Sequence, residues 1–133
     1  RTQMKTLNIT EEELLQSVVK GLKDKIYLIV NTELGEFEKE GEKQGYARLL
    51  VCEKAEYEAL ESIGLTERAE IVKFPITKYD GSDISGVVGK VVKTSNLDNW
   101  IFRKSNKDVG YGRQERQIVG LTYKLSMEEV AQL

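Results

Sequence analysis

The order of its strand-like segments constrains the fold of this chain more than any other feature. Runs rich in apolar and β-branched residues indicate strands at residues 26–34, 46–52, 68–76, 84–93, 100–104 and 116–125. Only one long helical crossover separates two of them, at residues 53–63. Because neighbouring parallel strands need such a crossover, most of the sheet must be antiparallel. The predicted fold is α+β and rich in β-structure: a small curved antiparallel sheet or a partly open barrel with two or three short helices.

Two further helices are predicted from capping boxes and from periodicity. Thr10 with Glu13, and Ser126 with Glu129, are spaced so that hydroxyl and carboxylate satisfy the free amide donors at a helix start. The first box predicts a helix over residues 11–22, and the second predicts a C-terminal helix. In the first helix, apolar residues recur at helical spacing and are interpreted as the side that covers the sheet: Leu14, Leu15, Val18, Val19 and Leu22.

Glycine and proline predict where the strands bend or end. Gly86 and Gly89 lie inside an apolar run, where glycine indicates a bulge, a sharp bend or the close approach of another backbone. Pro75 cannot donate a ladder hydrogen bond, so its strand is expected to end or to lie at a sheet edge near this residue. Residues 79–82 carry a turn pattern. Strongly bent strands are how small sheets close into barrels.

Two long connections are predicted to be loops. Residues 35–45 are expected to form a mobile hairpin tip, because glycines lie near both ends of the segment. Its alternating glutamates are interpreted as a solvated edge rather than a metal site: Glu36, Glu38, Glu40 and Glu42. Residues 105–115 are expected to form a second, glycine-rich loop between the last two strands.

This architecture resembles the barrel that binds oligonucleotides and oligosaccharides (the OB-fold), which has about this size and strand count. The usual internal helix of that barrel lies between its third and fourth strands, whereas the predicted crossover here follows the second. The resemblance is one of architecture alone and implies no particular function.

Length and composition predict a single globular domain. The chain has 133 residues, of which 40% are hydrophobic and 32% charged. Residues 1–9 are expected to form a flexible N-terminal tail. Arg1 is not a natural first residue, so residues 1–3 are expected to be left over from cloning or trimming, with Met4 as the native start. The sequence lacks an apolar run of about 20 residues and the pattern of a signal peptide, so no membrane partner and a cytoplasmic location are predicted.

The residue types that are absent exclude much enzyme chemistry. The chain contains no histidine, which excludes Ser-His and Cys-His nucleophile pairs and His-containing zinc sites. The single Cys52 lies in an apolar run and is interpreted as a small buried hydrophobic residue. Residues 86–90 lack the Gly-Lys-Ser/Thr ending of a phosphate loop. We therefore predict no enzyme activity, no cofactor and no metal site.

Residues 90–124 carry the one functional signal in the sequence. They contain eight cations against three acids, although the whole chain has a net charge of −2. Among them lie aromatic residues: Trp100, Phe102, Tyr111 and Tyr123. Single-stranded nucleic acid requires this combination, because cations contact phosphates and flat rings stack on unpaired bases.

The orientation of the aromatic residues leaves two alternatives. Trp100 and Phe102 are two residues apart on a predicted strand, so they point to the same face. They form an exposed platform if Ile101 points inward, and they belong to the core if it points outward. The segment from Gly110 to Arg113 is either a loop tip that closes on a ligand or an ordinary basic hairpin loop.

The sequence predicts a non-enzymatic, sequence-tolerant protein that binds single-stranded nucleic acid, DNA in the first instance, with moderate and salt-sensitive affinity. Stacking is assigned to Trp100, Phe102 and Tyr111. Phosphate contacts are assigned to Arg103, Lys104, Lys107, Arg113 and Arg116. The alternative is a protein-interaction or assembly component of a phage or plasmid system, for which the same residues contact another polypeptide and a homo-oligomer is expected.

Overall fold

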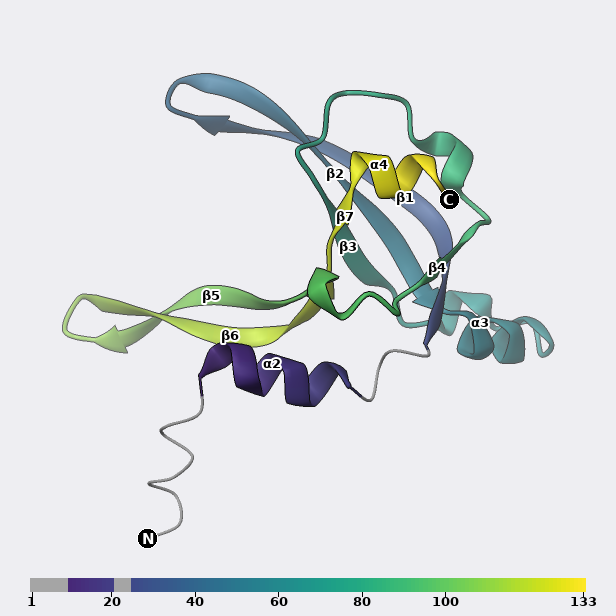
Figure 1. Cartoon of the computed structure of the whole chain (residues 1–133), viewed down its shortest axis with the longest axis horizontal. Coiled ribbons are helices and arrows are strands. Elements are labelled where there is room, and N and C mark those ends of the chain that lie inside the picture. Colours follow the sequence, from purple (N-terminus) through teal and green to yellow (C-terminus); the bar gives the residue numbers. More distant parts are fainter. Residues whose placement is uncertain (1–9, 21–24) are drawn as a thin grey trace, which may run out of the picture.

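A computed structural model describes residues 10–20 and 25–133 of the chain. A five-stranded sheet with the order β4-β1-β2-β3-β7 curls into a half-barrel, and a separate two-stranded sheet, β5-β6, extends from it (Figure 1). The pair β3-β7 is parallel, and the other pairs are antiparallel. The predicted α+β class with a curved, mainly antiparallel sheet is confirmed.

The structure gives bounds for each strand and helix, and several of them differ from the predicted ones. The large sheet consists of β1 (Ile26–Lys39), β2 (Glu42–Glu53), β3 (Val72–Thr77), β4 (Val91–Lys93) and β7 (Leu125–Ser126). The two-stranded sheet consists of β5 (Trp100–Gly110) and β6 (Arg113–Tyr123). The helices of the described residues are α2 (Glu11–Val19), α3 (Lys54–Glu61) and α4 (Met127–Ala131). None of these helices is long and apolar enough to cross a membrane.

The segment 35–45, predicted to be a mobile tip, instead continues the β1-β2 ladder almost to its end. Pairing runs from Gly35 opposite Tyr46 out to Lys39 opposite Glu42. Glu40 and Gly41, with φ of 54° and 80°, make the two-residue turn that suits a twisted hairpin. The alternation that looked like a solvated edge is the strand pattern itself, and it places glutamate opposite lysine across the hairpin.

The segment 105–115, predicted to be a loop, is also mostly strand. Lys107 lies opposite Glu115 and Asp108 opposite Gln114. Only Tyr111 and Gly112 form the turn, with φ of 56° and 72°. The β5-β6 hairpin therefore extends outward as an arm, and it projects on the same side of the sheet as the β1-β2 hairpin (Figure 1).

The run 84–93, predicted as one bent strand, is strand only over β4. Residues Ser85–Val87 form a short 3-10 turn instead. Gly89 has a φ of 92°, and its N–H donates to the carbonyl of Ile29 at 2.8 Å. Gly89 thus marks the close approach of the β1 backbone, which was one of the three expectations for it.

The other observed element boundaries agree more closely with the boundaries predicted from the sequence. Strand β3 begins at Val72 rather than residue 68 and ends two residues after Pro75. Ser126 and Glu129 form both hydrogen bonds of the capping box at α4. Thr10 caps α2 by accepting from the N–H of Glu13 at 3.1 Å. The predicted tail at residues 1–9, and the end of the first predicted helix at residues 21–22, lie outside the described residues.

The core lies inside the half-barrel and centres on aromatic rings. Phe74 of β3 packs edge-on against Trp100, with ring centroids 6.2 Å apart, and Trp100 packs edge-on against Tyr123 at 5.2 Å. From α2 only Val19 is fully buried, so the predicted apolar stripe covers the core in part. Cys52 is buried and unpaired, as predicted, and burial raises the pKa of its thiol.

Candidate functional site

A groove of about 600 Å³ separates the outer face of the large sheet from the root of the β5-β6 hairpin. We call it the basic groove, because four of its lining residues are cations: Arg48, Lys73, Arg103 and Lys104. The remaining lining residues are Pro75, Ile101, Ser105, Val119 and Thr122. Its cations come from three strands that are far apart in the sequence.

Strand alternation places the first two cations on the groove side. In β2, Ala47 and Leu49 are buried in the core, so Arg48 between them points to the outer face. In β3, Phe74 is buried and Lys73 beside it points outward. Neither cation belongs to the basic segment found in the sequence, so sequence reasoning missed both.

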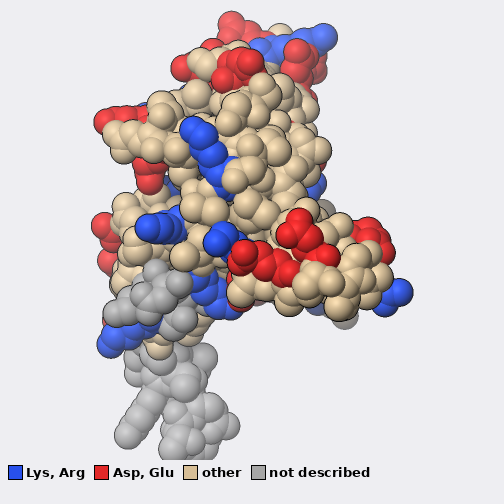
Figure 2. All heavy atoms as spheres, turned by 90° about the vertical axis from the view of Figure 1, so that its right-hand side faces the viewer, with Lys and Arg blue, Asp and Glu red and all other residues tan. Residues whose placement is uncertain are grey.

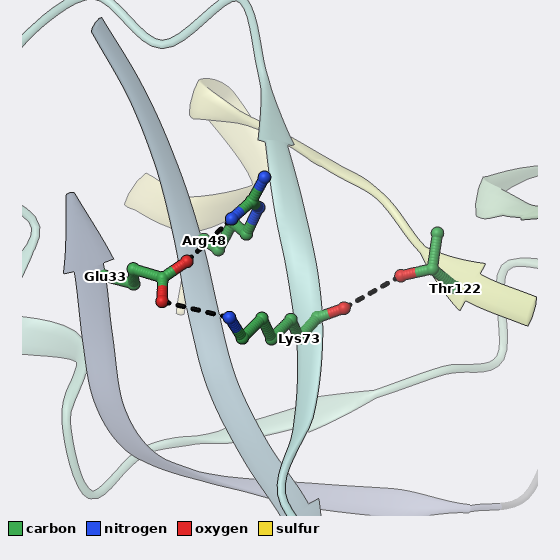
Figure 3. A network of polar contacts seen from close by, with 4 residues as sticks. All are labelled: Glu33, Arg48, Lys73 and Thr122. Atoms are coloured by element: carbon green, nitrogen blue, oxygen red, sulfur yellow. Dashed lines mark hydrogen bonds and ion pairs between the residues drawn. The ribbon is translucent and has the colours of Figure 1, made fainter. Parts of the chain in front are cut away.

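The β5-β6 hairpin supplies the other two cations and is fastened to the sheet. The Thr122 hydroxyl of β6 donates to the carbonyl of Lys73 at 2.9 Å (Figure 3). Across the hairpin, Arg103 lies opposite Gly120, and the register then shifts so that Val119 is an extra residue. A Cβ on Gly120 would lie 3.1 Å from Arg103 Nη2, so the glycine leaves room for the guanidinium side chain.

Carboxylates already neutralise much of this positive charge. Glu33 of β1 accepts from Arg48 at 2.7 Å through one oxygen and from Lys73 at 3.1 Å through the other (Figure 3). These two hydrogen bonds, with that from Arg48 the stronger influence, lower the pKa of Glu33, because they stabilise its ionised form. Lys104 donates to Glu11 of α2 at 2.6 Å. Within residues 10–20 and 25–133, Arg103 has no ion-pair partner.

The placement of Trp100 settles one alternative left open by the sequence. Its side chain is 3% exposed, and its Nε1–H donates to the carbonyl of Thr94 at 3.4 Å. Trp100 is therefore a core residue, and its assignment as a stacking residue is corrected. The physical reason is that the face it shares with Tyr123 packs onto Phe74 of the large sheet.

The remaining residues assigned from the sequence fall into two groups. Arg103 and Lys104 line the groove, whereas Phe102 is half-buried, does not line the groove and shares its face of β5 with Trp100. The others are exposed farther along the hairpin and do not line the groove: Lys107, Tyr111, Arg113 and Arg116. Since the hairpin is an extended arm, it does not fold back over its own strands as a closing loop would.

The opposite side of the molecule has a different charge pattern. Figure 2 shows the side away from the two projecting hairpins, where acidic side chains gather over the lobe that contains α3 and separate Lys and Arg side chains lie beside that lobe. That helix carries three glutamates against one lysine in its eight residues. The basic groove is thus a local feature of a chain whose net charge is negative.

Comparisons of the chain with protein-family models, with curated proteins and with solved structures find no match. In the described part of the chain, no group of three or more Cys, Asp or Glu side chains is arranged to hold a metal ion. Function is therefore inferred from the groove and its surroundings.

Proposed function

We propose that this chain is a non-enzymatic protein that binds single-stranded nucleic acid, with DNA as the first candidate, and that the basic groove holds the phosphate backbone. One observation carries the proposal: cations from β2, β3 and β5 converge on one groove although the chain has a net charge of −2. Such convergence suits a ligand with regularly spaced negative charges. Affinity is moderate, because several groove cations are already paired with carboxylates. It falls as salt rises, because cations that contact phosphates release counterions.

The position of the groove in the fold supports the proposal by analogy. Counted along the chain, the groove lies on the second and third strands of the large sheet, β2 and β3. The connection between its fourth and fifth strands, β4 and β7, contains the β5-β6 hairpin that forms the other wall. Small oligonucleotide-binding barrels hold their ligands on the same strands and at the same connection.

The hairpin extends the contact surface beyond the groove. Exposed cations continue from Arg103 and Lys104 toward the tip and are proposed to contact further phosphates: Lys107, Arg113 and Arg116. Tyr111 is fully exposed in the turn and remains a proposed contact for bases, whereas half-buried Phe102 shares its strand face with buried Trp100 and is no longer assigned to bases. Arg48 and Lys73 join this set, and Trp100 leaves it.

The test is a fluorescence-anisotropy titration of labelled oligo-dT at low salt. The expected result is saturable binding at micromolar protein that weakens linearly in log Kd against log salt. An absence of binding at tens of micromolar protein contradicts the proposal.

Exposed apolar residues on the β5-β6 hairpin favour a second function, as an interaction or assembly component: Val109, Tyr111, Ile118 and Val119. An extended arm with apolar side chains suits contact with another polypeptide, including a second copy of this chain. Light scattering with and without an oligonucleotide separates the two functions. A stable oligomer whose mass is indifferent to oligonucleotide favours assembly.

A further inference from the structure

A pair of aromatic residues, exposed Phe37 and half-buried Tyr46, lies on the outer face of the sheet beyond the end of the basic groove. Phe37 of β1 and Tyr46 of β2 have ring centroids 6.3 Å apart and planes tilted by 38°. Tyr46 shares its face of β2 with Arg48, since the two are separated by one residue. Phe37 is 45% exposed, so much of its ring is free to contact a ligand.

Tyr46 is held in place from two sides. A Cβ on Gly35 would lie 2.3 Å from the Tyr46 ring, so the ring lies across the β1 backbone where only glycine leaves room. The guanidinium carbon of Arg48 lies 4.5 Å from the centre of the same ring. Arg48 also lines the basic groove, and therefore Tyr46 connects the groove to Phe37.

The aromatic pair borders a hollow of about 460 Å³ at the base of the β1-β2 hairpin. Lys78 and Tyr79 line its other side. The Tyr79 hydroxyl donates to the carbonyl of Ser82 at 2.6 Å, which fixes that ring, and Lys78 adds an exposed cation. The hollow therefore combines flat rings with a positive charge and has room for a ring system.

We propose that Phe37, supported by the half-buried Tyr46 ring beside it, forms a stacking platform for the nucleobases of a strand whose phosphates lie in the basic groove. This inference rests on the proposed function and names the part of the surface that contacts bases, a role that buried Trp100 cannot fill. The order Arg48, Tyr46, Phe37 gives a path from phosphate contacts to base contacts along one face of the sheet. Stacking on these rings is tolerant of sequence, because every base offers a flat face.

The test compares oligo-dT with an abasic oligonucleotide of the same length, which has the same phosphates and no bases. Wild-type protein and the variants Phe37→Ala and Tyr46→Leu are titrated with both by anisotropy. The matched control is Leu34→Ala, because Leu34 is a 60% exposed apolar residue of the same hairpin that points to the opposite face. Circular dichroism confirms that each variant is folded.

We expect wild type to bind oligo-dT about tenfold or more tighter than the abasic strand, since stacking on one aromatic ring typically contributes that much. Phe37→Ala should lose much of this preference while its affinity for the abasic strand stays unchanged. Tyr46→Leu should lose the preference too, with some loss of affinity for the abasic strand, because the Tyr46 ring contacts the groove cation Arg48. Leu34→Ala should behave as wild type. Phe37→Trp should keep the preference, and its new exposed indole should be quenched by oligo-dT.

The outcomes separate the two proposals. If wild type binds neither strand, the proposed function fails and the platform with it. If wild type binds both strands equally, or if its preference for bases persists in Phe37→Ala and Tyr46→Leu, the platform is overturned while the phosphate groove stands.

Discussion

At the scale of single residues, two of the groove cations, Arg48 and Lys73, already share one acidic partner. Glu33 holds Arg48 and Lys73 with its two oxygens, so a phosphate must displace a carboxylate to reach them. Arg48 also contacts the Tyr46 ring, and the Lys73 backbone accepts from Thr122. Arg48 therefore keeps a second side-chain contact without Glu33, and we expect this carboxylate to act mainly as a competitor of the proposed ligand.

Removing that competitor should strengthen binding. We expect Glu33→Gln to raise the affinity for oligo-dT several-fold and to steepen the salt dependence by about 0.7 to 1 in log-log slope, as for one added phosphate contact. The control is Glu36→Gln, which changes the net charge equally on the other face of β1. Weaker binding by Glu33→Gln than by the control contradicts this role and shows that Glu33 positions the cations.

Trp100 should matter for stability rather than for binding. Because its ring is buried between Phe74 and Tyr123, Trp100→Ala should lower the free energy of unfolding by about 3 to 5 kcal/mol. Urea denaturation followed by circular dichroism measures this change. The folded fraction should bind oligo-dT as wild type does. A variant of unchanged stability that binds more weakly would place Trp100 at the interface after all.

At the scale of elements, the sequence was a good guide where one local signal decides the structure. The capping box at Ser126 predicted α4, and the helical crossover predicted at residues 53–63 contains α3. The prediction was wrong for residues 35–45 and 105–115, because an alternating pattern of polar residues does not distinguish a loop from an exposed hairpin arm. The long ladders there depend on cross-strand pairing, which a single sequence does not reveal.

The cations and the tyrosine of the β5-β6 arm should affect nucleic-acid binding in different ways. We expect Lys107→Ala and Arg113→Ala each to weaken binding to all sequences alike and to flatten the salt slope by about 0.7 to 1. Tyr111→Ala should cost affinity with little change in slope. Salt-dependent anisotropy measures both effects, with Lys39→Ala at the tip of the other hairpin as the control. Slopes that match wild type for both cation variants would mean that the arm does not reach the strand.

At the scale of the whole molecule, the site could be predicted only in part. The charge and aromatic content of residues 90–124 predicted Arg103 and Lys104 as site residues, and both line the groove. Arg48 and Lys73 carry no local signal and become groove residues only because the sheet curls and Thr122 of β6 docks on β3. The sequence also could not reveal which face of β5 packs inward, since that depends on where the hairpin meets the sheet.

The measurement that tests the central claim most directly compares a groove variant with a charge-matched control across salt concentrations. The groove variant is Lys73→Ala with Arg103→Ala, and the control is Lys39→Ala with Lys43→Ala on the β1-β2 hairpin. We expect the groove variant to bind oligo-dT at least about tenfold more weakly, with a salt slope flatter by about 1.4 to 2, and the control to bind nearly as wild type. Equal affinities and slopes for the two variants would contradict the assignment of the basic groove as the binding site.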